Sequence, residues 1–179
     1  HHFCCGRNEH VKETAMTNNA MRRGLGMANN TTEHNAFFRM VLEGITSRLP
    51  KKYAKNVQNE VSVKDPNGSG HVEPDVSLWR RSRWNAGKLE LEDLLLVVEV
   101  ARSPRNVGYA AKAIMKAFNF EPTMEEGFIF NYQKNEWIRY SRLENGEIVA
   151  EKADWSRVLN RFLDPLTRVS DTDWDELKL

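Results

Sequence analysis

The chain has 179 residues, of which 40% are hydrophobic and 28% are charged, a length and composition that fit one domain with a substantial core. Its 26 basic and 25 acidic side chains give a formal net charge of +1, which excludes a general attraction to nucleic acid, so any basic surface has to be local. The sequence contains no apolar run long enough for a membrane span and no segment that resembles a secretory signal. We therefore expect no membrane partner and a cytoplasmic or nuclear location.

The ends of the chain differ in composition from its middle. Residues 1–28 are polar and lack apolar periodicity, which predicts a disordered or weakly ordered tail. Cys4 and Cys5 are adjacent, a spacing that suits neither a disulfide framework nor a zinc site. We expect a single domain over residues 29–165, followed by a tail or short helix over residues 166–179.

The first half of this domain predicts a helix and then a hairpin. Thr31 or Thr32 can cap an amphipathic helix that ends before Pro50. Residues 56–63 and 72–79 alternate in polarity around a turn-forming segment, and they are expected to pair as a hairpin. The polar residues 80–92 are expected to form a loop.

The second half begins with the most apolar run of the chain, residues 94–100, which is typical of a strand that is buried on both faces. Further elements are predicted in this order: a crossover helix at 109–120, a second hairpin of strands 127–132 and 136–141, a short strand at 148–150, and a late helix at 155–162. Helices that alternate with strands in this way predict the α/β class.

Two acidic residues mark a candidate metal site. Glu99 stands at the end of the apolar run, where an unpaired carboxylate is costly, and Asp75 follows Pro74 in the preceding predicted strand. If the two strands are neighbours, both carboxylates can reach one ion. Oxygen ligands of this kind suit Mg²⁺, or Mn²⁺ in its place. Lys112 on the following helix can complete the site by orienting an attacking water, and Lys116, one turn later, is the alternative.

A family resemblance rests on these residues. The segments 72–79, 93–104 with Ser103-Pro104, Lys112 and 126–130 resemble the Uma-type restriction-endonuclease branch of the PD-(D/E)XK nuclease-like superfamily. The resemblance implies a restriction-endonuclease-like core, a central mixed β-sheet flanked by helices. It also implies that Asp75 and Glu99 are metal ligands and that Lys112 is the lysine of the site. In the commonest superfamily pattern the lysine follows the second acid by two positions, where this chain has Ala101.

Other residues are candidates for supporting roles. Glu33 on the first helix and Glu73 beside Asp75 can join the site, although a helix dipole or an exposed strand face also explains such acids. Histidines near turns, here His34 and His71, are more often ordinary surface residues than general bases.

The segment Arg80, Arg81, Arg83 and Trp84 combines cations with an aromatic ring, a pattern that suits contacts with nucleic-acid phosphates and bases. The sequence therefore predicts a Mg²⁺-dependent endodeoxyribonuclease with DNA as its partner, and the resemblance adds a possible homodimer. The alternative is a catalytically inactive nuclease-like domain that binds nucleic acid or protein, in which the same acids and lysine form an ion-pair network.

Overall fold

The structure of the protein is a computed structural model, which describes residues 32–49 and 55–164. The chain divides into a unit of residues 1–35 and a unit of residues 36–179. The first unit is described only over residues 32–35, at the start of helix α2 (Thr32–Arg48). The expectations for residues 1–28 and 166–179 lie outside the described residues. Within the described part, no helix is both long and apolar enough to cross a membrane.

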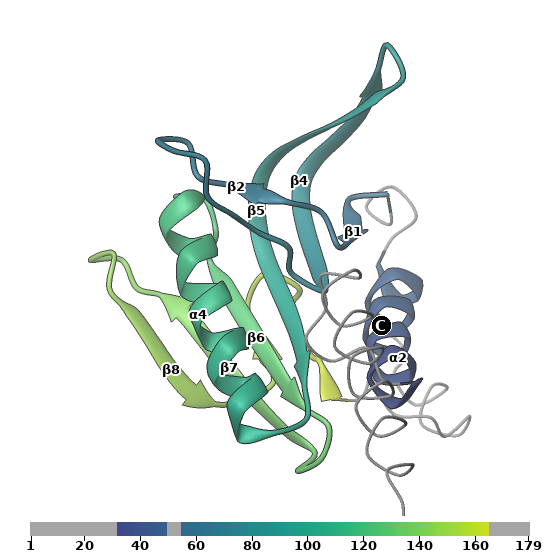
Figure 1. The fold of residues 1–179 in the computed structure, drawn as a ribbon, viewed down its shortest axis with the longest axis vertical. Helices are drawn as coiled ribbons and strands as arrows, with labels where there is room; N and C mark the ends of the chain where they lie inside the picture. The colour runs from purple at the N-terminus through teal and green to yellow at the C-terminus, as the bar shows by residue number, and fades with distance from the viewer. Residues whose placement is uncertain (1–31, 50–54, 165–179) are drawn as a thin grey trace, which may run out of the picture. The chain divides into compact units, whose positions relative to one another are not determined.

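The second unit is built on a mixed six-stranded sheet with the strand order β1-β4-β5-β6-β7-β8 (Figure 1). Its strands are β1 (Val57–Asn59), β4 (Val76–Asn85), β5 (Lys88–Ala101), β6 (Glu126–Asn131), β7 (Glu136–Arg142) and β8 (Ile148–Lys152). Strands β5 and β6 are parallel, and every other neighbouring pair in this sheet is antiparallel. The α/β class with a central mixed sheet is therefore confirmed.

Strand β5 is the central strand that its apolar run predicted. It pairs with β4 on one side and with β6 on the other. Its side chains alternate between two hydrophobic clusters: Val98 and Val100 pack in one, and Val97 and Ala101 pack in the other. Both faces of β5 are therefore covered, as the continuous apolar sequence requires.

Two helices cover the two faces of the sheet. Helix α4 (Pro104–Phe120) begins at Ser103, whose side chain accepts a hydrogen bond from the backbone N–H of Asn106, and it packs Ile114 against the cluster that holds Val97. Because β5 and β6 are parallel, α4 is the crossover that joins them. Val41 and Ile45 of α2 lie in the opposite cluster, so the sheet is flanked by helices as predicted.

The hairpin expected from residues 56–63 and 72–79 is present as two short pairings. Strand β1 pairs with the beginning of β4, and β2 (Val63–Lys64) pairs with β3 (His71–Val72) around the turn-forming segment. The second hairpin is also confirmed, because β6 and β7 are antiparallel neighbours.

The prediction of a loop at residues 80–92 is wrong. These residues continue β4 and β5 as a two-stranded ribbon, which we call the arm (residues 80–93) and which projects beyond the sheet in Figure 1. Ala86 and Gly87 both have positive φ, 49° and 77°, as a tight two-residue hairpin turn demands. The pairing of β1 ends at Leu78 and that of β6 ends at Leu96, so no other strand among the described residues pairs with the arm.

The prediction of a helix at residues 155–162 is also wrong. The segment forms two short antiparallel strands, β9 (Trp155–Ser156) and β10 (Arg161–Phe162). The buried carboxylate of Glu126 accepts hydrogen bonds from the Ser156 hydroxyl at 2.7 Å and from the Arg157 backbone N–H at 2.6 Å. A distant acceptor therefore replaces the local hydrogen bonds of a helix, which sequence periodicity cannot predict.

The close packing of α4 on β6 gives a stability prediction. A Cβ added to Gly127 would lie 2.6 Å from the Cγ2 atom of Ile114, whereas one added to Gly108 on α4 would meet no atom within 4 Å. We expect Gly127→Ala to lower the free energy of unfolding by about 1–3 kcal/mol through overpacking. Gly108→Ala should raise it by up to about 1 kcal/mol because alanine favours the helix. Urea denaturation of both variants measures the difference, and equal stabilities would contradict this packing.

Candidate active site

The register of the sheet brings Asp75 and Glu99 together. Strands β4 and β5 are antiparallel, and Val76 lies opposite Val98. The next residue on each strand is therefore Asp75 on one side and Glu99 on the other. The carboxyl groups of these two residues interact, and this interaction helps to raise the pKa of Glu99. A sequence separation of 24 residues thus becomes direct contact between two carboxyl groups.

Backbone contacts hold Asp75 in place. Its Oδ2 atom accepts a hydrogen bond from the backbone N–H of Val100 at 2.7 Å, so the Asp75 carboxyl is tied to the residue that follows Glu99. Its carbonyl oxygen accepts from the backbone N–H of Glu60 at 3.3 Å. Pro74, directly before it, is buried. Asp75 is therefore held by hydrogen bonds to β5 and to the residue that follows β1.

The surroundings of Glu99 favour its protonated form. The residue follows the alternation of β5 onto the α4 side of the sheet, between Val97 and Ala101, and pairs in register with Ile129. Desolvation by these apolar neighbours raises the pKa of Glu99 well above its ordinary value of 4.5, and the adjacent Asp75 carboxylate raises it further. Each of the two neighbouring carboxyl groups therefore makes ionisation of the other less favourable.

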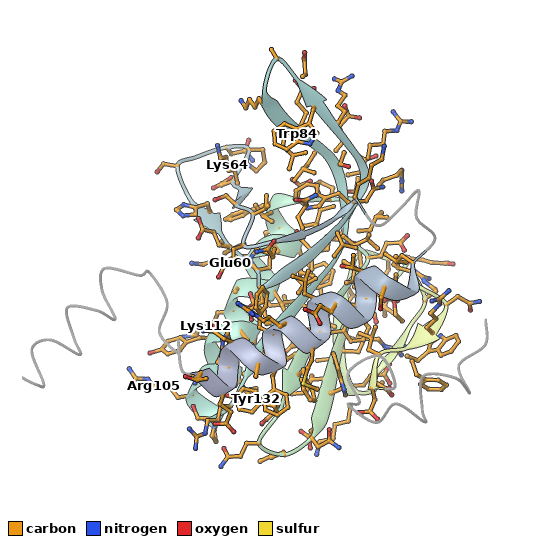
Figure 2. The ribbon with its side chains drawn as sticks, turned by 90° about the vertical axis from the view of Figure 1, so that its right-hand side faces the viewer. Glu60, Lys64, Trp84, Arg105, Lys112 and Tyr132 are labelled. Carbon is orange, nitrogen blue, oxygen red and sulfur yellow. The ribbon has the colours of Figure 1, made fainter. Side chains whose placement is uncertain are left out.

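The two candidate lysines lie on the exposed side of α4. Lys112 stands two residues from both Ala110 and Ile114, which are buried, so the helical period turns its side chain away from the sheet (Figure 2). Lys116 is exposed for the same reason, two residues from Ile114 and Phe118. The shift in the pKa of Glu99 comes from burial and Asp75, and neither lysine contributes to it.

The predicted supporting acids have other surroundings. The exposed Glu73 accepts a hydrogen bond from the Ser62 hydroxyl at 2.9 Å and lies 3.8 Å from His71 Nε2, so it links the β2–β3 hairpin to the preceding segment. Glu33 is exposed in the first turn of α2, within the unit of residues 1–35. Among the described side chains there is no group of three or more His, Cys, Asp or Glu residues arranged to hold a metal ion.

The arginines of the arm are paired with acids across the ribbon. Arg80 lies 3.3 Å from Asp93, Arg81 lies 3.7 Å from Glu92, and Arg83 lies 2.6 Å from Glu90. Trp84 near the tip has 74% of its surface exposed. Arginines in one segment and acidic residues in the next are typical of two paired strands. The sequence therefore contained a pattern for this ribbon, although the polar composition favoured a loop.

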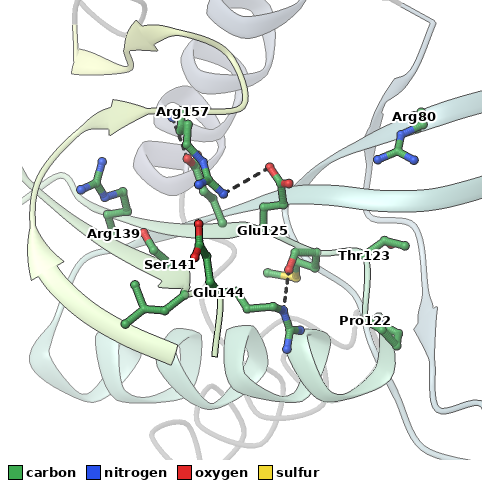
Figure 3. A pocket seen from close by; sticks show the side chains of 12 residues that line it. Arg80, Pro122, Thr123, Glu125, Arg139, Ser141, Glu144 and Arg157 are labelled. Carbon is green, nitrogen blue, oxygen red and sulfur yellow. Dashed lines mark hydrogen bonds and ion pairs between the residues drawn. The ribbon is translucent and has the colours of Figure 1, made fainter. Parts of the chain in front are cut away.

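Sequence reasoning missed Glu126, the buried carboxylate that anchors residues 156–158. It also missed a pocket beside this residue, which is lined by four arginines and three glutamates (Figure 3). These arginines come from separate strands and loops, and no local motif unites them.

Comparison with known proteins gives little further information. No family model matches the chain, and no curated protein matches it. One similar solved structure is that of a proposed nuclease belonging to DUF820 from Anabaena variabilis, with 14% sequence identity and a TM-score of 0.48 over 76% of this chain and 81% of that chain. At these values the likeness establishes neither a shared activity nor shared site residues.

The raised pKa of Glu99 predicts how stability depends on pH. Above pH 4.5 the unfolded chain loses the Glu99 proton while the folded chain retains it, so the folded state is favoured at low pH and this contribution is lost as the pH rises through the folded-state pKa. We expect Glu99→Gln, which cannot ionise, to become more stable relative to the wild type as the pH rises above 4.5. Urea denaturation without divalent metal over a pH series measures this, and a pH-independent difference would contradict it.

Proposed function

We propose that the protein is a metal-dependent nuclease that hydrolyses DNA phosphodiester bonds, in which Asp75 and Glu99 hold Mg²⁺ or Mn²⁺. The observation that carries this proposal is the contact between two carboxyl groups at the end of a buried central strand. Desolvation there is unfavourable to both charges. Such a pair is stabilised either by a shared proton or by a cation, and a divalent cation neutralises both groups at once.

The donor set suits a hard divalent cation. Carboxylate oxygens are the preferred protein ligands of Mg²⁺, which usually completes its coordination with water and substrate oxygens. A metal ion in this place would polarise the phosphodiester and stabilise the negative charge that develops during hydrolysis. Asp75, tied to the Val100 N–H at 2.7 Å, is the fixed ligand of the pair, and Glu99 must release its proton for the metal to bind.

Lys112 is the residue we assign to the attacking water. Its long, flexible side chain starts from the helix that covers the sheet face on which Glu99 lies. In the absence of substrate the ammonium group remains in solvent. To act at the strand end, the ammonium group would have to move around α4 from its solvent-facing side when a phosphate binds, and it would then orient the water and neutralise charge. Lys116, the alternative lysine, lies one turn further along α4.

DNA contact is assigned to the arm. Exposed ion pairs such as Arg81–Glu92 contribute little to stability, so phosphate groups can replace the glutamates as partners of the arginines. Trp84 offers an exposed ring on which a base can stack. One carboxylate pair would cleave one strand of a DNA duplex. A homodimer, with two such pairs, would cleave both DNA strands.

A cleavage assay tests the proposal. Plasmid and single-stranded DNA are incubated with Mg²⁺, Mn²⁺ or EDTA, and wild type is compared with the isosteric variants Asp75→Asn and Glu99→Gln. We expect metal-dependent cutting that falls by about 100-fold or more in each variant, because each loses a metal ligand. Glu73→Gln, which alters a nearby exposed acid outside the pair, is the control and should cut like wild type. Cutting that persists in both variants would overturn the assignment.

The two lysines give a separate prediction. Lys112→Ala should lower kcat by about 100-fold while leaving KM nearly unchanged, because the lysine acts on the water and not on substrate binding. Lys116→Ala, one turn away and equally exposed, is the matched control and should retain activity. Single-turnover kinetics at saturating DNA separate the two variants, and the opposite pattern would assign the role to Lys116.

The structure also favours one specific alternative, an inactive nuclease-like domain that binds nucleic acid or protein. The carboxyl groups of Asp75 and Glu99 interact with each other. Lys112 and Lys116 are exposed, so the expected ion-pair network of acids and lysine is reduced to the two acids in the described residues. If the wild type cuts no DNA with any metal and calorimetry detects no Mg²⁺ or Mn²⁺ binding, this alternative replaces the nuclease.

A further inference from the structure

The two faces of the arm differ in chemistry. Its large apolar side chains share one face, because Trp84 pairs with Leu89 and Ser82 pairs with Leu91. Charged side chains alternate with these and lie on the other face: Arg81, Arg83, Glu90 and Glu92. At its base Leu91 packs against the cluster that holds Val97. The apolar face therefore continues from the core of the protein outward to Trp84.

Trp84 lies at the outer end of this face, near the tip of the arm (Figure 2). Its side chain is 74% exposed, and Leu89 across the ribbon is only half-buried. A large exposed aromatic ring lacks the stabilisation that burial gives to apolar surface. The ring therefore offers a flat apolar surface that a planar partner can cover.

Hydrogen bonds on the charged face hold the strand that carries Trp84. Glu90 accepts a hydrogen bond from Arg83 Nε at 2.6 Å and another from Asn85 Nδ2 at 3.0 Å. The residues on both sides of Trp84 are thus bonded to the opposite strand. A ring that is presented by an ordered ribbon loses less conformational freedom when a partner binds.

Charge is distributed unevenly along the arm. The acids of the arm all lie within residues 90–93, towards the sheet. Beyond the Arg83–Glu90 pair, residues 84–88 contain one cation, the exposed Lys88, and no acid. A cation beside an exposed aromatic ring is the combination that binds a nucleic-acid strand, because the cation attracts a phosphate while a base stacks on the ring.

The size of the arm favours a nucleic-acid strand over a second copy of the chain as its partner. The strands of the ribbon extend about 20 Å and lie about 5 Å apart. One face of such a ribbon is far smaller than the roughly 800 Å² that each partner buries in a stable protein interface. A single base, in contrast, needs only one face of the Trp84 ring.

We propose that the tip of the arm selects DNA with unpaired bases, by stacking an unpaired base on Trp84 beside a phosphate that Lys88 contacts. This inference rests on the proposed function, because it takes DNA as the partner. The bases of a duplex are already stacked on both sides, and one new stack does not offset the cost of opening a base step. Single-stranded DNA and unpaired overhangs offer their bases without this cost.

The contact at the tip is separate from the carboxyl pair. Leu89, which lies opposite Trp84, precedes Glu99 by ten residues on β5. This separation corresponds to as much as about 33 Å of extended strand. DNA binding by the tip can therefore be measured without metal and without cleavage.

Fluorescence anisotropy in EDTA tests the proposal with a labelled single strand of DNA and with a blunt duplex of the same sequence. We expect the wild type to bind the single strand about tenfold or more tightly than the duplex. Trp84→Ala should weaken binding of the single strand by about tenfold and hardly change binding of the duplex, because the variant loses the stacked base. Trp84→Phe keeps an aromatic ring and should retain most of the affinity.

Trp155→Ala is the matched control, since Trp155 is also exposed but lies on β9, outside the arm. It should bind both DNAs like wild type. Equal affinity of the wild type for the two DNAs, no binding to either, or equal weakening by Trp84→Ala and Trp155→Ala would overturn the proposal. A dimer that dissociates in the Trp84→Ala variant during sedimentation would also overturn it, because the arm would then join two copies of the chain.

The outcomes for the arm and for the nuclease can be told apart. A protein that prefers single strands through Trp84 but cuts no DNA with any metal would contradict the nuclease alone. A protein that cuts DNA with metal but shows no preference for single strands would contradict the inference about the arm alone.

Discussion

The burial of β5 on both faces is the constraint on which the rest of the structure depends. Apolar side chains of this strand enter two separate clusters, so one helix must cover each face, and α4 must cross over to the parallel strand β6. The same burial gives Glu99 its chemistry. A carboxyl group at the end of such a strand is partly desolvated, and the antiparallel register with β4 places Asp75 against it. Packing therefore brings the two acids together and raises the pKa of one of them.

The sequence predicted those elements whose local hydrophobic pattern matches the side chains that are buried in the fold. The run at residues 94–100 is apolar at every position but Glu99, and it became the central strand. Helix α4 has both a capping serine and an apolar stripe, and its predicted existence was confirmed with a start five residues earlier than expected. The contact between Asp75 and Glu99 followed from the expectation that their strands are neighbours.

The parts that the sequence did not predict depend on distant partners. The arm is polar, and the side chains across its two strands form ion pairs such as Arg83–Glu90. A search for hydrophobic alternation does not detect such a ribbon. Residues 155–162 have a helical pattern, but the carboxylate of Glu126 binds their backbone from another strand. The direction of the Lys112 side chain depends on which face of α4 is buried, and the spacing from Glu99 alone does not determine it.

The central proposal is that the neighbouring carboxyl groups of Asp75 and Glu99 bind a divalent cation, and that Glu99 loses its proton when the cation binds. The most direct measurement follows the side-chain carboxyl carbon of Glu99 by NMR during pH titrations with and without Mg²⁺. The account predicts that Glu99 titrates well above 4.5 without metal, that Asp75→Asn lowers its pKa, and that Mg²⁺ lowers it in the wild type. A Glu99 that titrates near 4.5, or whose titration is unchanged by Mg²⁺, would contradict the account.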